Sequence, residues 1–167
     1  KPKLNVSFEN ITNYIYFGNQ GMPQQHSGNI QVLAADLQLN ITSPWINMEN
    51  SIVYQRSSSA YLPLPALILY NNLYYHDTWV KALDVQFGVD MRFFTKYYAP
   101  ILNPALGQFC VQEQEKVGNY PVMNVYANFY VKHIRLKLFA QYQHFNASFM
   151  NKQYFAMPGY PMAPDMF

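Results

Sequence analysis

The sequence has few charged residues, one cysteine and no long apolar run, and each shortage excludes a class of protein. Only 12% of its 167 residues are charged, about half of the roughly 25% that soluble domains carry. Because Cys110 is the single cysteine, no disulfide can form within the chain. No apolar run approaches the 18 or more residues of a membrane-spanning helix, which excludes a helical membrane protein. The net charge of +2 favours no polyanionic partner, so we expect no nucleic-acid binding.

The residues that are present alternate in character along an extended run, Ala82–Phe94. Between positions 83 and 93 every odd-numbered residue is apolar, while every even-numbered one is polar, charged or glycine. Side chains of a β-strand point alternately to its two faces, so this run predicts a strand with one apolar face. Soluble strands are most often about 5–6 residues long, whereas crossing an outer membrane takes roughly 9–11 residues. The length and pattern therefore favour a transmembrane strand.

Six more runs with alternating character predict six more strands. The first changes phase along its length, which we interpret as a β-bulge. The connections between the runs are alternately long and short, as expected for an outer-membrane barrel with short periplasmic turns and longer extracellular loops. Both tryptophans, Trp45 and Trp79, fall in predicted short turns, where they would lie at the membrane interface. The predicted strands are Leu4–Phe17, Asn29–Thr42, Ile46–Gln55, Ala66–His76, Pro121–Val131 and Ile134–Phe145, and the short turns are Ser43–Trp45, Asp77–Lys81 and Lys132–His133.

The charged residues of the regular strands all fall on the polar register. On a lipid-facing surface each Arg or Lys would cost roughly 2–4 kcal/mol at mid-membrane, so in a barrel these residues would line the lumen. There they could tune ion selectivity or cross-link a narrow, closed interior. The pattern alone leaves open a soluble barrel or sandwich with the faces inverted. The predicted lumen-lining residues are Asp36, Gln38, Glu49, Asp84, Gln86, Asp90, Arg92, Arg135, Lys137, Gln141 and Gln143.

Several linked motifs resemble a known family. They are LPLPALILYNNLYYHDTWVKAL, GVDMRFFTKYYAPILNPALGQF, GNYPVMNVYANF and the terminal YPMAPDMF. These motifs occur in matching order from about Leu62 to Phe167. Together they resemble the C-terminal part of a family of outer-membrane proteins, the "putative porins" of Bacteroides-type outer membranes. The resemblance implies an outer-membrane β-barrel, exposed at the cell surface, that passes small solutes. It also implies a further apolar and aromatic strand after Phe167, so we expect the chain to be a fragment of a longer barrel.

Signals for enzymatic chemistry are weak. The four histidines have no Cys, Asp or Glu at metal-ligand spacing except in the adjacent pair His76-Asp77. Cys110 lies among acidic neighbours that do not favour a thiolate. The sequence has no Gly-x-Ser-x-Gly, phosphate-binding or dinucleotide-binding motif. We therefore expect neither an enzyme nor a cofactor.

The sequence as a whole predicts an all-β protein, an antiparallel up-and-down transmembrane β-barrel in the bacterial outer membrane. Residues 1–167 would form a single barrel segment of about seven strands. The expected function is passive diffusion of small hydrophilic solutes, with outer-membrane lipid and further outer-membrane chains or copies of itself as partners. The alternatives are a non-conducting structural or assembly subunit of the outer membrane, and a soluble barrel or sandwich that binds carbohydrate through Tyr-rich loops.

Overall fold

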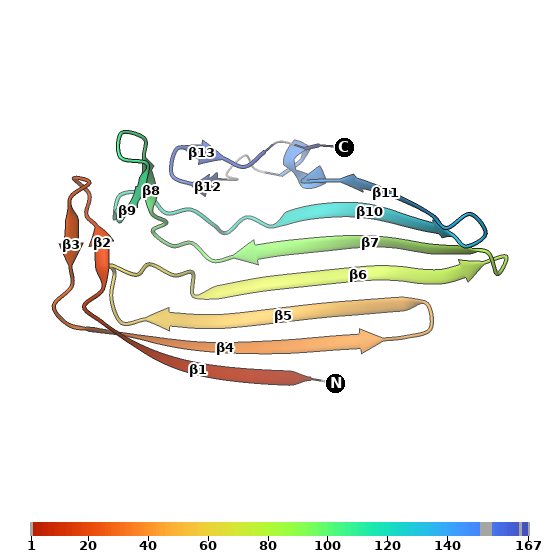
Figure 1. The fold of residues 1–167 in the computed structure, drawn as a ribbon, viewed down its shortest axis with the longest axis horizontal. Coiled ribbons are helices and arrows are strands. Elements are labelled where there is room, and N and C mark those ends of the chain that lie inside the picture. The colour runs from red at the N-terminus through yellow and green to blue at the C-terminus, as the bar shows by residue number, and fades with distance from the viewer. Residues whose placement is uncertain (1, 151–154, 164, 167) are drawn as a thin grey trace.

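Seven long strands form one antiparallel sheet in the computed structural model, which describes residues 2–150, 155–163 and 165–166. Neighbours in the sheet follow the order β1-β4-β5-β6-β7-β10-β11, so each long strand pairs with the next one along the chain (Figure 1). The all-β antiparallel fold is confirmed, and each of the seven predicted strands overlaps one long strand of this sheet. Their bounds are β1 Lys3–Thr12, β4 Asn29–Thr42, β5 Ile46–Ser57, β6 Leu67–Trp79, β7 Leu83–Phe94, β10 Val122–Val131 and β11 Leu136–Tyr142.

The strand register gathers the apolar side chains on one face of this sheet. Directly opposed residues share a face, and Leu4, Leu37, Ile52, Leu69 and Phe93 form one such row across five strands. The adjacent row on the other face contains Gln38, Ser51, Tyr70 and Arg92. We call the first the apolar face and the second the polar face. The predicted sorting of the alternating runs is therefore confirmed at the level of register.

The two ends of the sheet differ as the alternating loop lengths predicted. Three tight turns lie at one end, which we call the turn end, and the long connections lie at the other, the loop end (Figure 1). The long connections are more regular than expected. Two of them pair to form a four-stranded sheet, with the order β3-β2-β9-β8. Its strands are β2 Ile15–Phe17, β3 Pro23–Gln25, β8 Ile101–Asn103 and β9 Gln108–Cys110, and the C-terminal region adds a 3-10 helix η1 Phe145–Ser148 and a hairpin of β12 Phe155–Met157 and β13 Tyr160–Pro161.

The first predicted strand is two strands, and the proposed bulge is wrong. β1 ends at Thr12, and Asn13 takes a left-handed conformation with φ 55°. Asn tolerates this conformation better than most residues. The chain then leaves the main sheet, and β2 joins the small sheet. The change of apolar phase that the sequence shows thus marks a change of sheet.

The second turn is shorter than predicted. β6 continues to Trp79, and Val80 and Lys81 both have positive φ, at 53° and 58°. Two consecutive positive φ values define the type I′ turn that suits a tight hairpin. The turn is closed by the Ala82 amide, which donates to the Trp79 carbonyl at 3.1 Å. Trp79 is consequently the last residue of a strand rather than part of the turn.

The third turn is longer than predicted, and the last strand is shorter at both of its ends. It spans positions 132–135, and Arg135 closes it with φ 53°, so Arg135 lies in the turn and not in a strand. A residue in the left-handed region cannot continue the extended strand. At the other end of this strand, β11 stops at Tyr142. Gln143 instead forms an isolated bridge with Met166.

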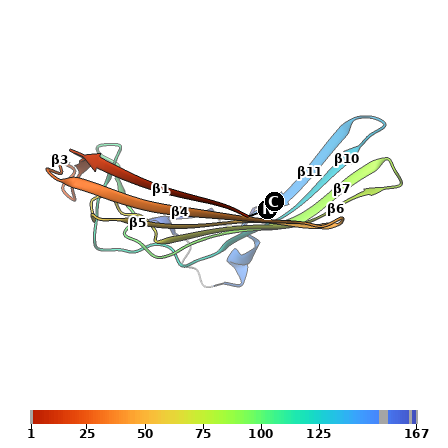
Figure 2. The same cartoon turned by 90° about the horizontal axis from the view of Figure 1, so that it is seen from below.

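The large sheet is open within the described residues. β1 and β11 each pair with one long strand, and no described sheet closes into a barrel. Figure 2 shows a twisted, curved layer. No helix in the described part of the chain has the length and apolar character needed to cross a membrane.

Candidate functional site

In the central strands of the sheet, polar-face side chains are on the whole less exposed than apolar-face ones, whereas the edge strands β1 and β11 are exposed on both faces. On β7, Asp90 is 8% exposed while its neighbour Val89, on the opposite face, is 39% exposed. Val85, which is fully buried, departs from this trend on the apolar face. Soluble proteins bury the apolar side of a sheet and rarely expose a large contiguous apolar patch. The exposed large residues of the apolar face include Leu4, Val6, Phe8, Leu33, Ile41, Ile46, Leu73, Phe87, Val89, Val125, Leu136 and Leu138.

A row of alternating amides and acids crosses the middle of the polar face. Five consecutive strands, β4 to β7 and then β10, contribute Asn40, Glu49, Asn72, Asp90 and Asn124 in register. We call these five residues the acid–amide row. The Asn124 amide donates to Asp90 at 2.8 Å, and the Asn72 amide donates to Glu49 at 3.4 Å. Since no cation belongs to the row, its two carboxylates make it a strip of negative charge.

Two tyrosines, placed nearer the turn end, donate hydrogen bonds to residues of the acid–amide row. The Tyr74 hydroxyl donates to Glu49 at 3.3 Å, and the Tyr126 hydroxyl donates to the Asn72 carbonyl oxygen at 2.9 Å. Tyr126 reaches Asn72 from β10 by lying across Gly88 of β7, where a Cβ atom would overlap its ring. Gly88 therefore makes room for a tyrosine that spans three strands.

One cation of the polar face, Arg92, lies toward the loop end. Arg92 stacks over the Tyr70 ring, with its guanidinium carbon 5.8 Å from the ring centroid. Asp36, two strands from Tyr70, accepts hydrogen bonds from Ser51 at 3.1 Å and from Gln38 at 3.0 Å. The face thus alternates in charge along the strand direction, from Arg92 to the acids of the acid–amide row.

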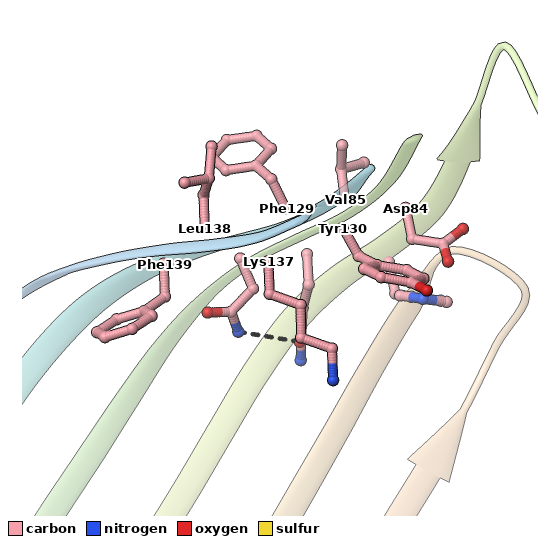
Figure 3. A pocket seen from close by; sticks show the side chains of 10 residues that line it. Asp84, Val85, Phe129, Tyr130, Lys137, Leu138 and Phe139 are labelled. Atoms are coloured by element: carbon pink, nitrogen blue, oxygen red, sulfur yellow. Dashed lines mark hydrogen bonds between the residues drawn. The ribbon is translucent and has the colours of Figure 1, made fainter. Parts of the chain in front are cut away.

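A cavity of about 400 Å³ lies at the turn end, over β7, β10 and β11 (Figure 3). In Figure 3, Asp84, Tyr130, Lys137 and Phe139 lie on one side of the strands, and Val85, Phe129 and Leu138 on the other. Asp84 pairs with Lys132 of the third turn at 2.8 Å and accepts from the Thr78 hydroxyl at 2.6 Å.

Lys137, from the neighbouring strand, lies with its ammonium 5.7 Å from the Tyr130 ring centroid. Among the described residues it has no carboxylate within ion-pair distance. Gln86 accepts from the Asn128 amide at 3.2 Å. The turn end of the polar face therefore carries a paired acid and a separate cation.

The structure brings most of the predicted lumen-lining residues to one face. Arg135 lies in the turn, and Gln143 follows the end of β11, where its amide donates to Gln141 at 3.4 Å. Phe139, which the sequence reading passed over, also lies on the polar face and is 85% exposed. The predicted residues found on the polar face of the long strands are Asp36, Gln38, Glu49, Asp84, Gln86, Asp90, Arg92, Lys137 and Gln141.

Sequence reasoning selected charges and glutamines, and so it missed the partners that hold them. Asn72, Asn124 and Asn128 occupy the same alternating positions as the predicted residues, as do Tyr70, Tyr74 and Tyr126. The alternation itself was the available signal for all six. Tyrosine was overlooked because its ring suits either face of such a sheet.

The apolar face carries one polar pair at the height of the acid–amide row. The Asn71 amide donates to the Asn50 carbonyl oxygen at 2.5 Å, and the Asn50 amide donates to the Leu39 backbone carbonyl at 2.9 Å. The same row of the register contains Met91 and Met123. Asn71 interrupts the apolar pattern in the sequence, and its side-chain amide finds a partner in Asn50.

The C-terminal region packs near the loop end of the polar face. Met162, Ala163 and Met166 share a cavity of about 270 Å³ with residues of that face. Asp165 accepts hydrogen bonds from the Tyr142 hydroxyl at 2.7 Å and from Ser148 at 3.4 Å. The hydrogen bond from Tyr142 stabilises the ionised carboxylate and lowers the pKa of Asp165.

Groups suited to metal chemistry are not gathered in the described part of the chain. No three His, Cys, Asp or Glu side chains lie there in an arrangement that could hold a metal ion. Cys110 is a buried free thiol in β9, within the small sheet.

Comparison with known proteins gives a family and no individual relative. No curated protein and no solved structure matches the chain. A family model described as "Putative porin" matches residues 1–167, the whole sequence. The match agrees with the resemblance seen in the sequence motifs and with the all-β antiparallel fold. The chain belongs to the putative porin family.

Proposed function

We propose that the seven-stranded sheet is part of a β-barrel in the bacterial outer membrane, through which small hydrophilic solutes diffuse passively. The apolar face contacts lipid, and the polar face lines the lumen. The observation that carries this proposal is the inverted exposure of the sheet, with Asp90 hidden and Val89 exposed on adjacent positions of β7. Contact with lipid is the environment in which exposed apolar strands are stable.

The dimensions of the central strands support this orientation. β4 to β7 contain 14, 12, 13 and 12 residues. At about 3.3 Å per residue, 12 residues span roughly 40 Å. Tilted by about 45°, such a strand crosses close to the 30 Å of a hydrocarbon core. The charged residues on the apolar face fit the same picture, because Arg56 and Asp77 lie at opposite ends of the strands.

The open edges of the sheet support a larger assembly. Unpaired strand edges are not tolerated in lipid, because their backbone groups have no water to bind. At the β11 edge the backbone of Met166 already exchanges two hydrogen bonds with Gln143, at 2.7 and 3.1 Å. We propose that further strands, from the same protein or from another outer-membrane chain or copy, continue the sheet from both edges.

The acid–amide row gives the proposed pore a preference for cations. Rings of acidic side chains favour cations in membrane pores, and Glu49 and Asp90 face the proposed lumen at one height. Arg92 lies one row away, so it moderates the effect without removing it.

Conductance of the full-length protein in planar bilayers tests the function. We expect stepwise currents with a modest preference for potassium over chloride. Glu49→Gln and Asp90→Asn should each lower that preference, because each removes one lumen charge. Asp77→Asn is the matched control, since Asp77 lies on the apolar face and should leave selectivity unchanged. Open channels with equal selectivity in all variants would contradict the assignment of the polar face to the lumen.

A non-conducting outer-membrane subunit is the second candidate, favoured by the position of the C-terminal region. Met162 and Met166 share a cavity with Arg92, Asn124 and Gln141 of the polar face, so this segment partly covers the proposed lumen wall. A folded, membrane-inserted protein that gives no current would support this structural role over diffusion.

A further inference from the structure

The loop end carries a second polar cavity, separate from the polar face of the large sheet. Its volume is about 460 Å³, within the range of about 300–1,000 Å³ typical of ligand sites. It lies between the β2–β3 hairpin and the segment that follows β9. Its lining includes Tyr16, Asn19, Gln20, Gln24, Tyr61 and Gln114.

Pairing between distant loops holds this cavity together. Phe17 of β2 pairs in parallel with Cys110 of β9, and the Val111 amide donates to the Phe17 carbonyl at 2.9 Å. Beyond β9, the buried Gln112 side chain ties down its own loop. Its amide donates to the Ala99 and Glu115 carbonyls at 2.7 Å, and its oxygen accepts from the Gln114 and Glu115 amides at 2.7 and 2.8 Å. The cavity wall is therefore built on fixed backbone.

Several polar side chains in the cavity have hydrogen-bonding groups to spare. Within the described chain, no hydrogen bond or ion pair engages the side chains of Asn19, Gln20, Glu113 and Gln114. Gln24 uses only its oxygen, which accepts from the Tyr16 hydroxyl at 2.9 Å. An amide carries two donors and an acceptor, so these residues present both kinds of group to the cavity.

Two stacked tyrosines complete the wall. The Tyr16 and Tyr61 rings lie 4.4 Å apart between centroids, with an angle of 22° between their planes. The stack continues to Tyr14 on one side, and on the other the His26 ring packs against Tyr61 at an angle of 48°. Aromatic rings in such a site give an apolar surface with polar hydroxyl rims.

We propose that this cavity binds a neutral saccharide. A sugar ring offers hydroxyl groups that both donate and accept, which matches amide side chains, and C–H groups that contact the part of the Tyr61 ring that the stack leaves exposed. The lining includes no Lys or Arg and a single acid, Glu113, which disfavours an anionic ligand. An adjoining cavity, lined by Arg56, Lys96 and Lys116, differs in this respect. The proposal goes beyond passive diffusion, because surface binding requires no open lumen.

Binding measurements on the full-length protein in detergent test the proposal. The probes are neutral oligosaccharides built from glucose, mannose, galactose, xylose or N-acetylglucosamine. Saturation-transfer NMR detects their binding. We expect at least one probe to bind. Gln24→Ala and Gln114→Ala should each weaken its binding about three- to tenfold, the usual effect of losing a hydrogen bond. Tyr61→Ala should weaken it further, and Tyr61→Phe should retain most of it.

The adjacent residue on β3 provides a matched control. Gln25 is the strand neighbour of Gln24 and does not line the cavity, so Gln25→Ala should bind as the unmodified protein does. Far-UV circular dichroism checks that each variant keeps its strand content. Failure of every neutral probe to bind, or equal weakening by Gln24→Ala and Gln25→Ala, would overturn the proposal. Binding without conductance would reject the diffusion pore alone, and conductance without binding would reject the saccharide site alone.

Discussion

Single residues set the geometry of the polar face, and Gly88 does so most directly. Its missing side chain lets Tyr126 cross β7 and donate a hydrogen bond to Asn72 at 2.9 Å. An added methyl group would overlap the tyrosine ring and force it to move. Elsewhere in a strand interior, replacing glycine with alanine usually stabilises by roughly 0.5–1 kcal/mol.

We therefore expect the effect of Gly88→Ala to depend on Tyr126. In the unmodified protein it should lower the free energy of unfolding by about 1–3 kcal/mol, as overpacking does. In a Tyr126→Ala background the same change should be neutral or stabilising. Urea unfolding in lipid vesicles measures all four variants of this cycle. An equal cost in both backgrounds would show that Tyr126 is not the reason for the glycine.

The sequence predicted the face on which strand residues lie, but not the backbone conformation of the turn residues. Alternation placed Asp90 and Arg92 on the polar face because strand geometry allows only two directions. The sequence did not predict the left-handed backbone conformation of Val80, Lys81 and Arg135, because residues with positive φ at tight turns are usually Gly, Asn or Asp. Each misplaced turn boundary arose at such a residue.

Strand elements were predicted well wherever burial of one face repeats along the chain. The short strand β9 escaped prediction and β2 was taken as the end of the first strand, because each has three residues and their pairing joins distant loops. A local pattern of period two cannot be recognised over so short a run. The same reason explains why the sequence did not predict which residues line the cavity that is built on this pairing.

On the apolar face, the Asn50–Asn71 pair between β5 and β6 yields a prediction at this scale. Replacing one partner leaves the other polar group without its hydrogen bond, whereas replacing both removes the need for it. We expect Asn71→Leu to lower the free energy of unfolding by about 1–2 kcal/mol in vesicles, in the range of polar contacts in membranes. The double change Asn50→Leu with Asn71→Leu should recover much of that loss. Additive losses in the double variant would contradict the pairing.

The whole molecule is an open, two-faced sheet, and its orientation decides its function. Val89→Arg and Gln86→Arg place the same charge on opposite faces of β7. In lipid, arginine at position 89 should cost roughly 2–4 kcal/mol of unfolding free energy. At position 86, facing a hydrated lumen, it should cost under about 1 kcal/mol. Unfolding of the full-length protein from vesicles measures both, and a larger cost at position 86 would favour the soluble orientation.

Cysteine labelling in intact outer membranes tests the central claim, that the polar face lines an open lumen and the apolar face contacts lipid. Cys110→Ser, with serine at any further cysteine of the full-length protein, first removes the native thiols. Single cysteines are then introduced by Gln86→Cys or Gln141→Cys on the polar face, and by Phe87→Cys or Leu138→Cys on the apolar face. A membrane-impermeant thiol reagent should label the first pair and leave the second unlabelled. Labelling at 87 and 138 would contradict the account, whereas protection of all four positions would leave the orientation standing and reject the open lumen.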